Sequence, residues 1–172
     1  MKLGSVAAIL RALNAADVRV LVVGGLAVNA HGYLRFTRDA DLAIDLVPEN
    51  ILRTFEALAT LGYRPLVPIS AAQFADPELR RSWIRDKEMK VLQFQSDQHR
   101  ETPVDIFVIE PFDFGQEYRG AFSNTIEIPG QVPVPARCVS IETLIAMKEV
   151  VARAQDLIDV QHLRWILEDR QE

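Results

Sequence analysis

The chain has 172 residues and a formal net charge of −5, from 19 Lys and Arg against 24 Asp and Glu. This length is typical of one domain, and an apolar share of 49% is enough for a core. The acidic balance argues against a protein that coats nucleic acid, because such binding depends on a basic surface. The single cysteine, Cys138, excludes an intrachain disulfide framework.

The N-terminal segment is interrupted by Arg11 and Asp17, so it lacks the unbroken apolar core of a signal peptide. No apolar run approaches the roughly 20 residues that a membrane span needs. We therefore expect a cytoplasmic protein that does not associate with membranes.

The first half of the chain predicts alternating helices and strands. Apolar residues at helical spacing predict helices, whereas β-branched runs and period-two alternation predict strands. The clearest period-two pattern covers residues 39–47, where apolar and acidic positions alternate. The predicted elements are a helix at 5–16, a strand at 18–23, a short helix at 26–31, a strand at 39–47 and a helix at 48–60.

The second half begins with residues 65–81, which two prolines interrupt and which predict a mobile loop with a short helix. The order of all the elements indicates one α/β (α+β) domain over residues 1–172, with a mixed β-sheet. The remaining predicted elements are strands at 89–95 and 103–109, a helix at 112–120, a hairpin at 124–135, and a helical pattern from 141 to 168 that is capped by Ser140 and broken near Ala154.

Two aspartates two positions apart give the sharpest chemical signal. Asp39 and Asp41 fall on one face of the alternating strand, where two unpaired like charges are unfavourable. A divalent cation would neutralise them, and carboxylate oxygens suit Mg²⁺. The alternative is a solvated strand face, which is common for an isolated D-x-D.

Asp105 interrupts the otherwise apolar strand Val-Asp-Ile-Phe-Val-Ile. A charge inside such a strand is costly unless it is paired or metal-bound. With Asp39 and Asp41 it could hold two metal ions for phosphoryl or nucleotidyl transfer, and it could help to activate the attacking hydroxyl. The alternative is a structural pair between Asp105 and an arginine.

Gly24 and Gly25 follow a predicted buried strand and open a short helix. Exposed backbone N–H groups at that point, helped by the helix dipole, could bind phosphates. A glycine pair after a strand is more often a plain turn, but this one lies upstream of the D-x-D.

Two charged residues fall on apolar stripes of the C-terminal helices. Lys148 shares a stripe with Leu144 and Ile145, and Asp156 shares one with Val160. A charged side chain in such a position snorkels, pairs or lines a cleft. Lys148 could meet a triphosphate, and Asp156 could orient it or contact a base; the alternative is a structural ion pair.

In combination, residues 22–28 (VVGGLAV) and 35–42 (RFTRDADL) resemble the signature of the polymerase-β-like nucleotidyltransferase superfamily. More narrowly, the chain resembles the AbiEii-like and minimal nucleotidyltransferases, a group that includes toxin–antitoxin toxins. Residues 148–159 resemble the closing motif of that group, a lysine followed by a basic residue and D-x-x-D. The chain departs from the motif at Gln155, where the group usually has a basic residue.

The resemblance implies a mixed sheet flanked by helices, with a nucleoside triphosphate in a cleft that the helical part at 136–172 completes. It also implies that Asp39, Asp41 and Asp105 are catalytic and bind Mg²⁺. The residues that it assigns to nucleotide binding are Gly24, Gly25, Arg35, Thr37, Lys148 and Asp156.

We therefore expect a Mg²⁺-dependent nucleotidyltransferase that moves a nucleoside monophosphate from an NTP to a hydroxyl and releases pyrophosphate. The acceptor could be an RNA 3′ end, a protein side chain or a small molecule such as an antibiotic, and an acceptor with amino groups would suit an acidic cleft. A toxin–antitoxin component with an antitoxin partner is a further expectation, and extended contact with nucleic acid is not expected.

Two other functions compete with this one. A catalytically inactive binding module of the same fold is the main alternative, and the intact set of three carboxylates argues against it. A metal-dependent phosphohydrolase would explain the carboxylates but not the order of the glycine pair, helix and D-x-D.

Overall fold

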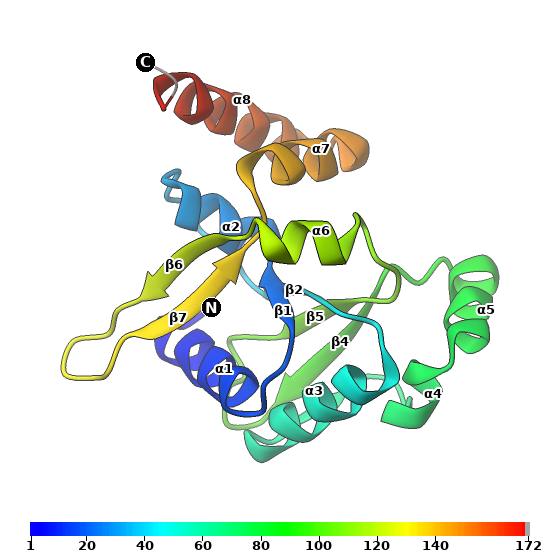
Figure 1. Cartoon of the computed structure of the whole chain (residues 1–172). Coiled ribbons are helices and arrows are strands. Elements are labelled where there is room, and N and C mark those ends of the chain that lie inside the picture. The colour runs from blue at the N-terminus through cyan, green and yellow to red at the C-terminus, as the bar shows by residue number, and fades with distance from the viewer. Residues whose placement is uncertain (171–172) are drawn as a thin grey trace.

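The computed structural model describes residues 1–170. These residues form helices and strands that alternate along most of the chain (Figure 1). In chain order the elements are α1 (Leu3–Ala15), β1 (Val20–Val22), α2 (Gly24–His31), β2 (Ala40–Ile44), α3 (Pro48–Thr60), β3 (Tyr63–Pro65), α4 (Ala71–Ala75), α5 (Pro77–Lys87), β4 (Val91–Ser96), β5 (Val104–Phe107), α6 (Phe114–Arg119), β6 (Phe122–Ile126), β7 (Val134–Cys138), α7 (Ile141–Val151) and α8 (Ala154–Asp169).

The strands form one mixed sheet in the order β3-β4-β5-β2-β1-β7-β6. β2 lies at the centre, antiparallel to β1 and parallel to β5, and β5 is antiparallel to β4. This pairing aligns Asp41 with Asp105, and Asp105 with Gln93. Directly paired residues point to the same side of a sheet, so these three polar side chains form a row across one face.

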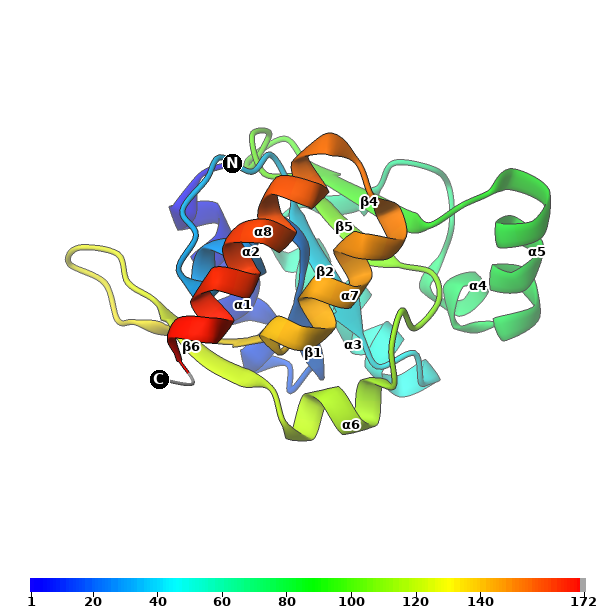
Figure 2. The ribbon, with the colours of Figure 1, turned by 90° about the horizontal axis from the view of Figure 1, so that it is seen from above.

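Helices cover both faces of the sheet. Figure 1 shows α1 and α3 on one side and α7 and α8 on the other, and Figure 2 shows α7 and α8 crossing above the centre of the sheet. Val20, Leu21 and Val22 are buried on both faces of β1, as the predicted β-branched run requires. The prediction of a mixed sheet flanked by helices is confirmed.

The prediction of a loop with a short helix over residues 65–81 is confirmed in part, since a loop leads into the short helix α4, but it missed β3 and α5. β3 begins at Tyr63 as an edge strand beside β4, and two helices follow it. Ser70 and Gln73 form a capping box at the start of α4, and Asp76 caps α5. α5 is largely polar and exposed, so it lacks the apolar periodicity that would have predicted a helix.

Other predicted elements are present with shifted ends. The short helix begins at Gly24, because the glycine pair forms its first turn. β2 begins at Ala40, so Asp39 lies just before the strand. The predicted break near Ala154 is confirmed, because α7 ends at Val151, Ala152 adopts a left-handed conformation with φ of 54°, and α8 begins at Ala154. In the described part of the chain, no helix is long and apolar enough to cross a membrane.

Candidate active site

Asp41 and Asp105 lie side by side on β2 and β5, because the parallel pairing of these strands aligns their Cα atoms. Asp39 lies two residues before Asp41. Burial, together with the charges of Asp39 and Asp105, raises the pKa of Asp41 to about 6. The structure therefore places Asp41 and Asp105 side by side at the centre of the sheet, with Asp39 near enough for its charge to act on both.

Asp105 is oriented by an amide. Gln93 Nε2 donates a hydrogen bond of 2.9 Å to Asp105 Oδ1, and Gln95 Nε2 donates to Gln93 Oε1 at 3.4 Å. Burial raises the pKa of Asp105, the hydrogen bond from Gln93 opposes this, and the charge of Asp39 adds to the rise. Asp105 has no ion-pair partner within residues 1–170, so the alternative of a structural arginine pair is wrong.

Sequence reasoning did not single out Gln93. The signal that could have found it is its place in the predicted strand at 89–95, where a glutamine alternates with apolar residues. Only the register with β5 shows that it faces Asp105. The register between two strands cannot be predicted from the sequence of either strand alone.

The glycine pair holds the start of α2 against these carboxylates. Gly24 adopts φ of +58°, and a Cβ at this position would lie 1.9 Å from Asp41 Oδ2. A Cβ at Gly25 would lie 2.5 Å from Thr37 Oγ1. The backbone N–H of Gly25 donates to the Asp41 carboxylate. Both glycines are therefore required for close approach, and a helix N-terminus faces the carboxylate cluster.

Lys148 lies in a buried ion-pair network at the joint between α7 and α8. Its Nζ is 3.1 Å from Asp156 Oδ1 and 2.6 Å from Asp159 Oδ2. Arg153 Nε is 2.8 Å from Asp156 Oδ2. The structural ion pair, which was the alternative interpretation of Lys148 and Asp156, is therefore present. Lys148 also lines the same cleft as Gly24.

Arg35 joins this network from the loop before β2. Its Nε and Nη2 each lie 2.7 Å from one carboxylate oxygen of Asp159, which is fully buried. Burial acts to raise the pKa of Asp159, but hydrogen bonds from Arg35, Lys148 and Gln155 outweigh it, so this pKa lies below its ordinary value. The loop and the C-terminal helices are therefore held together by charge.

Asp159 is the second residue that sequence reasoning did not assign. It is the last residue of the D-x-x-D, but it does not fall on the apolar stripe that Asp156 shares with Val160. The stripe therefore did not point to it. Residues three apart on a helix share a face, so the spacing from Asp156 could have indicated it.

A cleft of about 590 Å³ opens between the sheet, α5 and α7. Its polar end is formed by Gly24, Asp41, Lys148, Arg153 and Asp156. The rest of the lining is mostly apolar and comprises Ile84, Met89, Phe107, Ile109, Pro111, Phe112, Ala146, Met147, Val150 and Val151, with Lys90 and Thr143.

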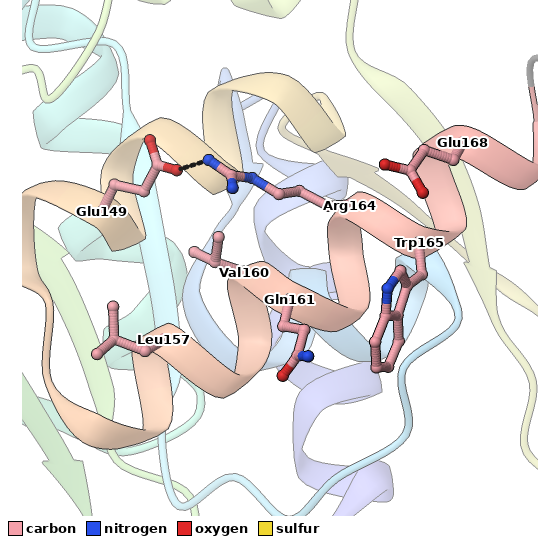
Figure 3. Close-up of a pocket in the computed structure, with 7 residues that line it drawn as sticks. All are labelled: Glu149, Leu157, Val160, Gln161, Arg164, Trp165 and Glu168. Atoms are coloured by element: carbon pink, nitrogen blue, oxygen red, sulfur yellow. Dashed lines mark hydrogen bonds and ion pairs between the residues drawn. The ribbon is translucent and has the colours of Figure 1, made fainter.

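A second hollow of about 430 Å³ lies on the outer surface of α7 and α8. Figure 3 shows Glu149 and Arg164 paired across it, with Leu157 near the start of α8 and Trp165 next to Arg164 toward its end. None of the predicted site residues lines this hollow. The candidate active site is therefore the cleft that begins at Gly24 and Asp41.

The carboxylates fit a hard cation in their donor chemistry, since they are oxygen ligands whose mutual repulsion a cation would relieve. Among residues 1–170, no three His, Cys, Asp or Glu side chains lie close enough together to hold a metal ion as they stand.

Known proteins resemble this chain in structure and not in sequence. No family model and no curated protein matches it. A crystal structure of ANT(2″)-Ia in complex with adenylyl-2″-tobramycin matches with a TM-score of 0.61 at 15% identity, over 98% of this chain and 91% of that one. The lincosamide antibiotic adenylyltransferase LnuA, bound to lincomycin, matches with a TM-score of 0.54 at 16% identity, over 92% and 93%.

A solution structure of ANT(2″)-Ia matches with a TM-score of 0.55 at 17% identity, over 98% of this chain and 92% of that one. At such identities the likeness shows the fold, which is that of the antibiotic nucleotidyltransferases. The narrower resemblance to the AbiEii-like group stays a prediction.

Proposed function

We propose that the protein is a nucleotidyltransferase that moves a nucleoside monophosphate from an NTP to a hydroxyl group of a small molecule. The observation that carries this proposal is the arrangement of Gly24, Asp41 and Asp105. A helix N-terminus, which suits phosphate, touches one carboxylate, and a second carboxylate stands beside the first on the next strand. The fold shared with antibiotic nucleotidyltransferases supports the same chemistry.

Each predicted residue has a role in this proposal. Backbone N–H groups at Gly24 and Gly25 bind the phosphates, and Lys148 contributes positive charge from the opposite side of the cleft. Thr37 and Arg35 hold the loop that carries Asp39, since Thr37 packs against Gly25 and Arg35 binds Asp159. Asp156 fixes Lys148.

Mg²⁺ held by Asp39, Asp41 and Asp105 would supply charge neutralisation at the triphosphate. The carboxylate of Asp105, oriented by Gln93, accepts the proton of the attacking hydroxyl. The acceptor oxygen forms a bond to the α-phosphorus, the bond from the α-phosphorus to the bridging oxygen breaks, and pyrophosphate leaves with that oxygen. The proton then passes from Asp105 to solvent.

A small-molecule acceptor is favoured over an RNA end or a protein side chain. The cleft volume of about 590 Å³ lies within the range of small-ligand sites, about 300–1,000 Å³. The structural neighbours are described with adenylyl-2″-tobramycin and with lincomycin. The net charge of −5 disfavours a nucleic-acid acceptor. A toxin–antitoxin role has no comparable support.

The test is calorimetric titration of each NTP, with and without Mg²⁺, into wild-type protein and into Asp39→Asn/Asp41→Asn. We expect binding that requires Mg²⁺ and is lost in the double variant. Asp97→Asn, the same chemical change at an exposed carboxyl, is the matched control and should bind as wild type does. If folded wild type binds no NTP, the proposal fails and an inactive binding module takes its place.

A further inference from the structure

We propose that the hydroxyl acceptor is a compound with a largely apolar body and no cationic groups, which lies in the cleft beyond Asp105. This inference rests on the proposed function and adds the acceptor class to it. The acceptor would donate its hydroxyl proton to Asp105 as its oxygen bonds to the α-phosphorus and pyrophosphate departs.

The position of the acceptor follows from the order of residues across the sheet. Gly24 takes the phosphate end, Asp41 follows, and Asp105 lies one strand farther on. Phe107 is two residues after Asp105 on the same face of β5, about 7 Å along the strand. A hydroxyl held at Asp105 therefore has its carbon skeleton over Phe107.

The cleft around Phe107 has an apolar wall. The wall residues Ile84, Met89, Phe107, Ile109, Phe112, Met147 and Val151 come from α5, β5, α7 and the adjoining loops, and they all line one cleft. Ile109 is 56% exposed and Val151 is 49% exposed, although both are large and apolar. Apolar side chains that gather in a cleft and remain open to water mark a binding surface for an apolar ligand.

The charges of the cleft disfavour a cationic acceptor. Asp41 and Asp156 are the acidic residues that line it, both at its polar end, and Asp39 and Asp105 lie close to Asp41. Asp156 is already bound by Lys148 and Arg153. Lys90 is a third cation of the lining. The expectation from sequence that the acceptor carries amino groups stays a prediction, and the present inference departs from it. A polycationic aminoglycoside would find no carboxylate among the apolar wall residues, whereas a neutral compound needs no charged partner there.

The test compares two sets of hydroxyl compounds of similar size by saturation-transfer NMR with ATP and Mg²⁺ present. One set is neutral with an aromatic or aliphatic body, such as chloramphenicol, and the other is polycationic, such as tobramycin. We expect binding in the first set, weakened about tenfold or more in Ile109→Glu, because the change puts a charge on the apolar wall. Ile158→Glu, the same change at an exposed position outside the cleft, should bind as wild type does.

Three outcomes would overturn the inference. Binding by the polycationic set alone would show that the wall does not select the acceptor. A complete absence of binding in the apolar set, with ATP still bound, would refute this acceptor class and leave the proposed function standing. Weaker ATP binding in Ile109→Glu, with no change for the alcohols, would show that the wall holds the nucleobase. If the wild-type protein does not bind ATP at all, the proposed function itself is refuted.

Discussion

The guanidinium of Arg35 holds the carboxylate of Asp159 through two parallel hydrogen bonds of 2.7 Å, although 124 residues separate them. Asp159 is fully buried, and Lys148 binds it from another side. The pair therefore joins the loop before β2, which carries Asp39, to the helices that form the far wall of the cleft. Stability and the shape of the site depend on the same contact.

Arg35→Ala should lower the free energy of unfolding by about 2–4 kcal/mol, because it removes one partner of a buried charge. Urea unfolding measures this directly. The control is Arg64→Ala, which removes an exposed pair with Asp97 at 3.3 Å and should cost about 0–1 kcal/mol. If Arg35→Ala lowers the free energy of unfolding as little as Arg64→Ala does, the buried pair does not stabilise the fold.

Asp41→Asn should stabilise the metal-free protein at neutral pH by up to about 3 kcal/mol. The folded pKa is raised from 3.8 to about 6, so the native state binds more protons than the unfolded chain between these values. The contribution of this group to stability therefore falls as pH rises from about 4 to 6. Asparagine keeps an acceptor for the Gly25 N–H, so only the charge is lost.

The measurement for Asp41 is urea unfolding of both proteins in a chelator at several pH values. The difference in stability between the variant and wild type should level off below about pH 4. There the Asp41 carboxyl becomes protonated in the unfolded chain as well as in the folded protein. A difference that does not change with pH would contradict the assignment of the effect to the charge of Asp41.

Gly24→Ala should abolish nucleotide binding while the protein remains folded, because the new Cβ would displace the Asp41 carboxylate from the start of α2. Gly130→Ala is the matched control. Gly130 also has a positive φ, of +76°, but a Cβ there meets nothing within 4 Å. Both variants carry backbone strain of about 1 kcal/mol, so only the close contact at Gly24 distinguishes them. Titration with ATP and Mg²⁺ would show whether binding is lost in one or in both.

Gln93→Leu should raise the pKa of Asp105 in the metal-free protein, because the hydrogen bond from Gln93 favours the charged carboxylate. NMR titration of the Asp105 carboxyl carbon measures the shift. Gln95→Leu should have a smaller effect, since Gln95 contacts Gln93 and not Asp105. An unchanged titration in Gln93→Leu would mean that the amide does not orient the proton acceptor.

The local patterns of the sequence predicted the elements that carry the chemistry. Alternation located β2 and Asp41, the apolar run located β5 and Asp105, and the glycine pair located the start of α2. Each of these signals lies within a few neighbouring residues. What they could not give is the partner of each charge, because Arg35 and Asp159, or Gln93 and Asp105, meet only after the chain has folded.

The segment after α3 was mispredicted in part for a different reason. α5 begins at Pro77 behind the cap of Asp76, a recognisable start signal, but most of its surface faces water. A helix of this kind has no apolar stripe for periodicity to detect. The same helix contributes Ile84 to the cleft, so sequence analysis could not place this part of the cleft lining.

The alignment of Asp41 with Asp105 is set by backbone hydrogen bonds between two central strands, whereas Ile84, Ile109 and Val151 come from a helix, a loop and another helix. If the chain is the proposed nucleotidyltransferase, reaction and selectivity are encoded in separate parts of the chain. Substitutions in the wall would then change which alcohol is accepted without moving the carboxylates. A library that varies these three positions would search for new acceptors while the transfer chemistry stays constant.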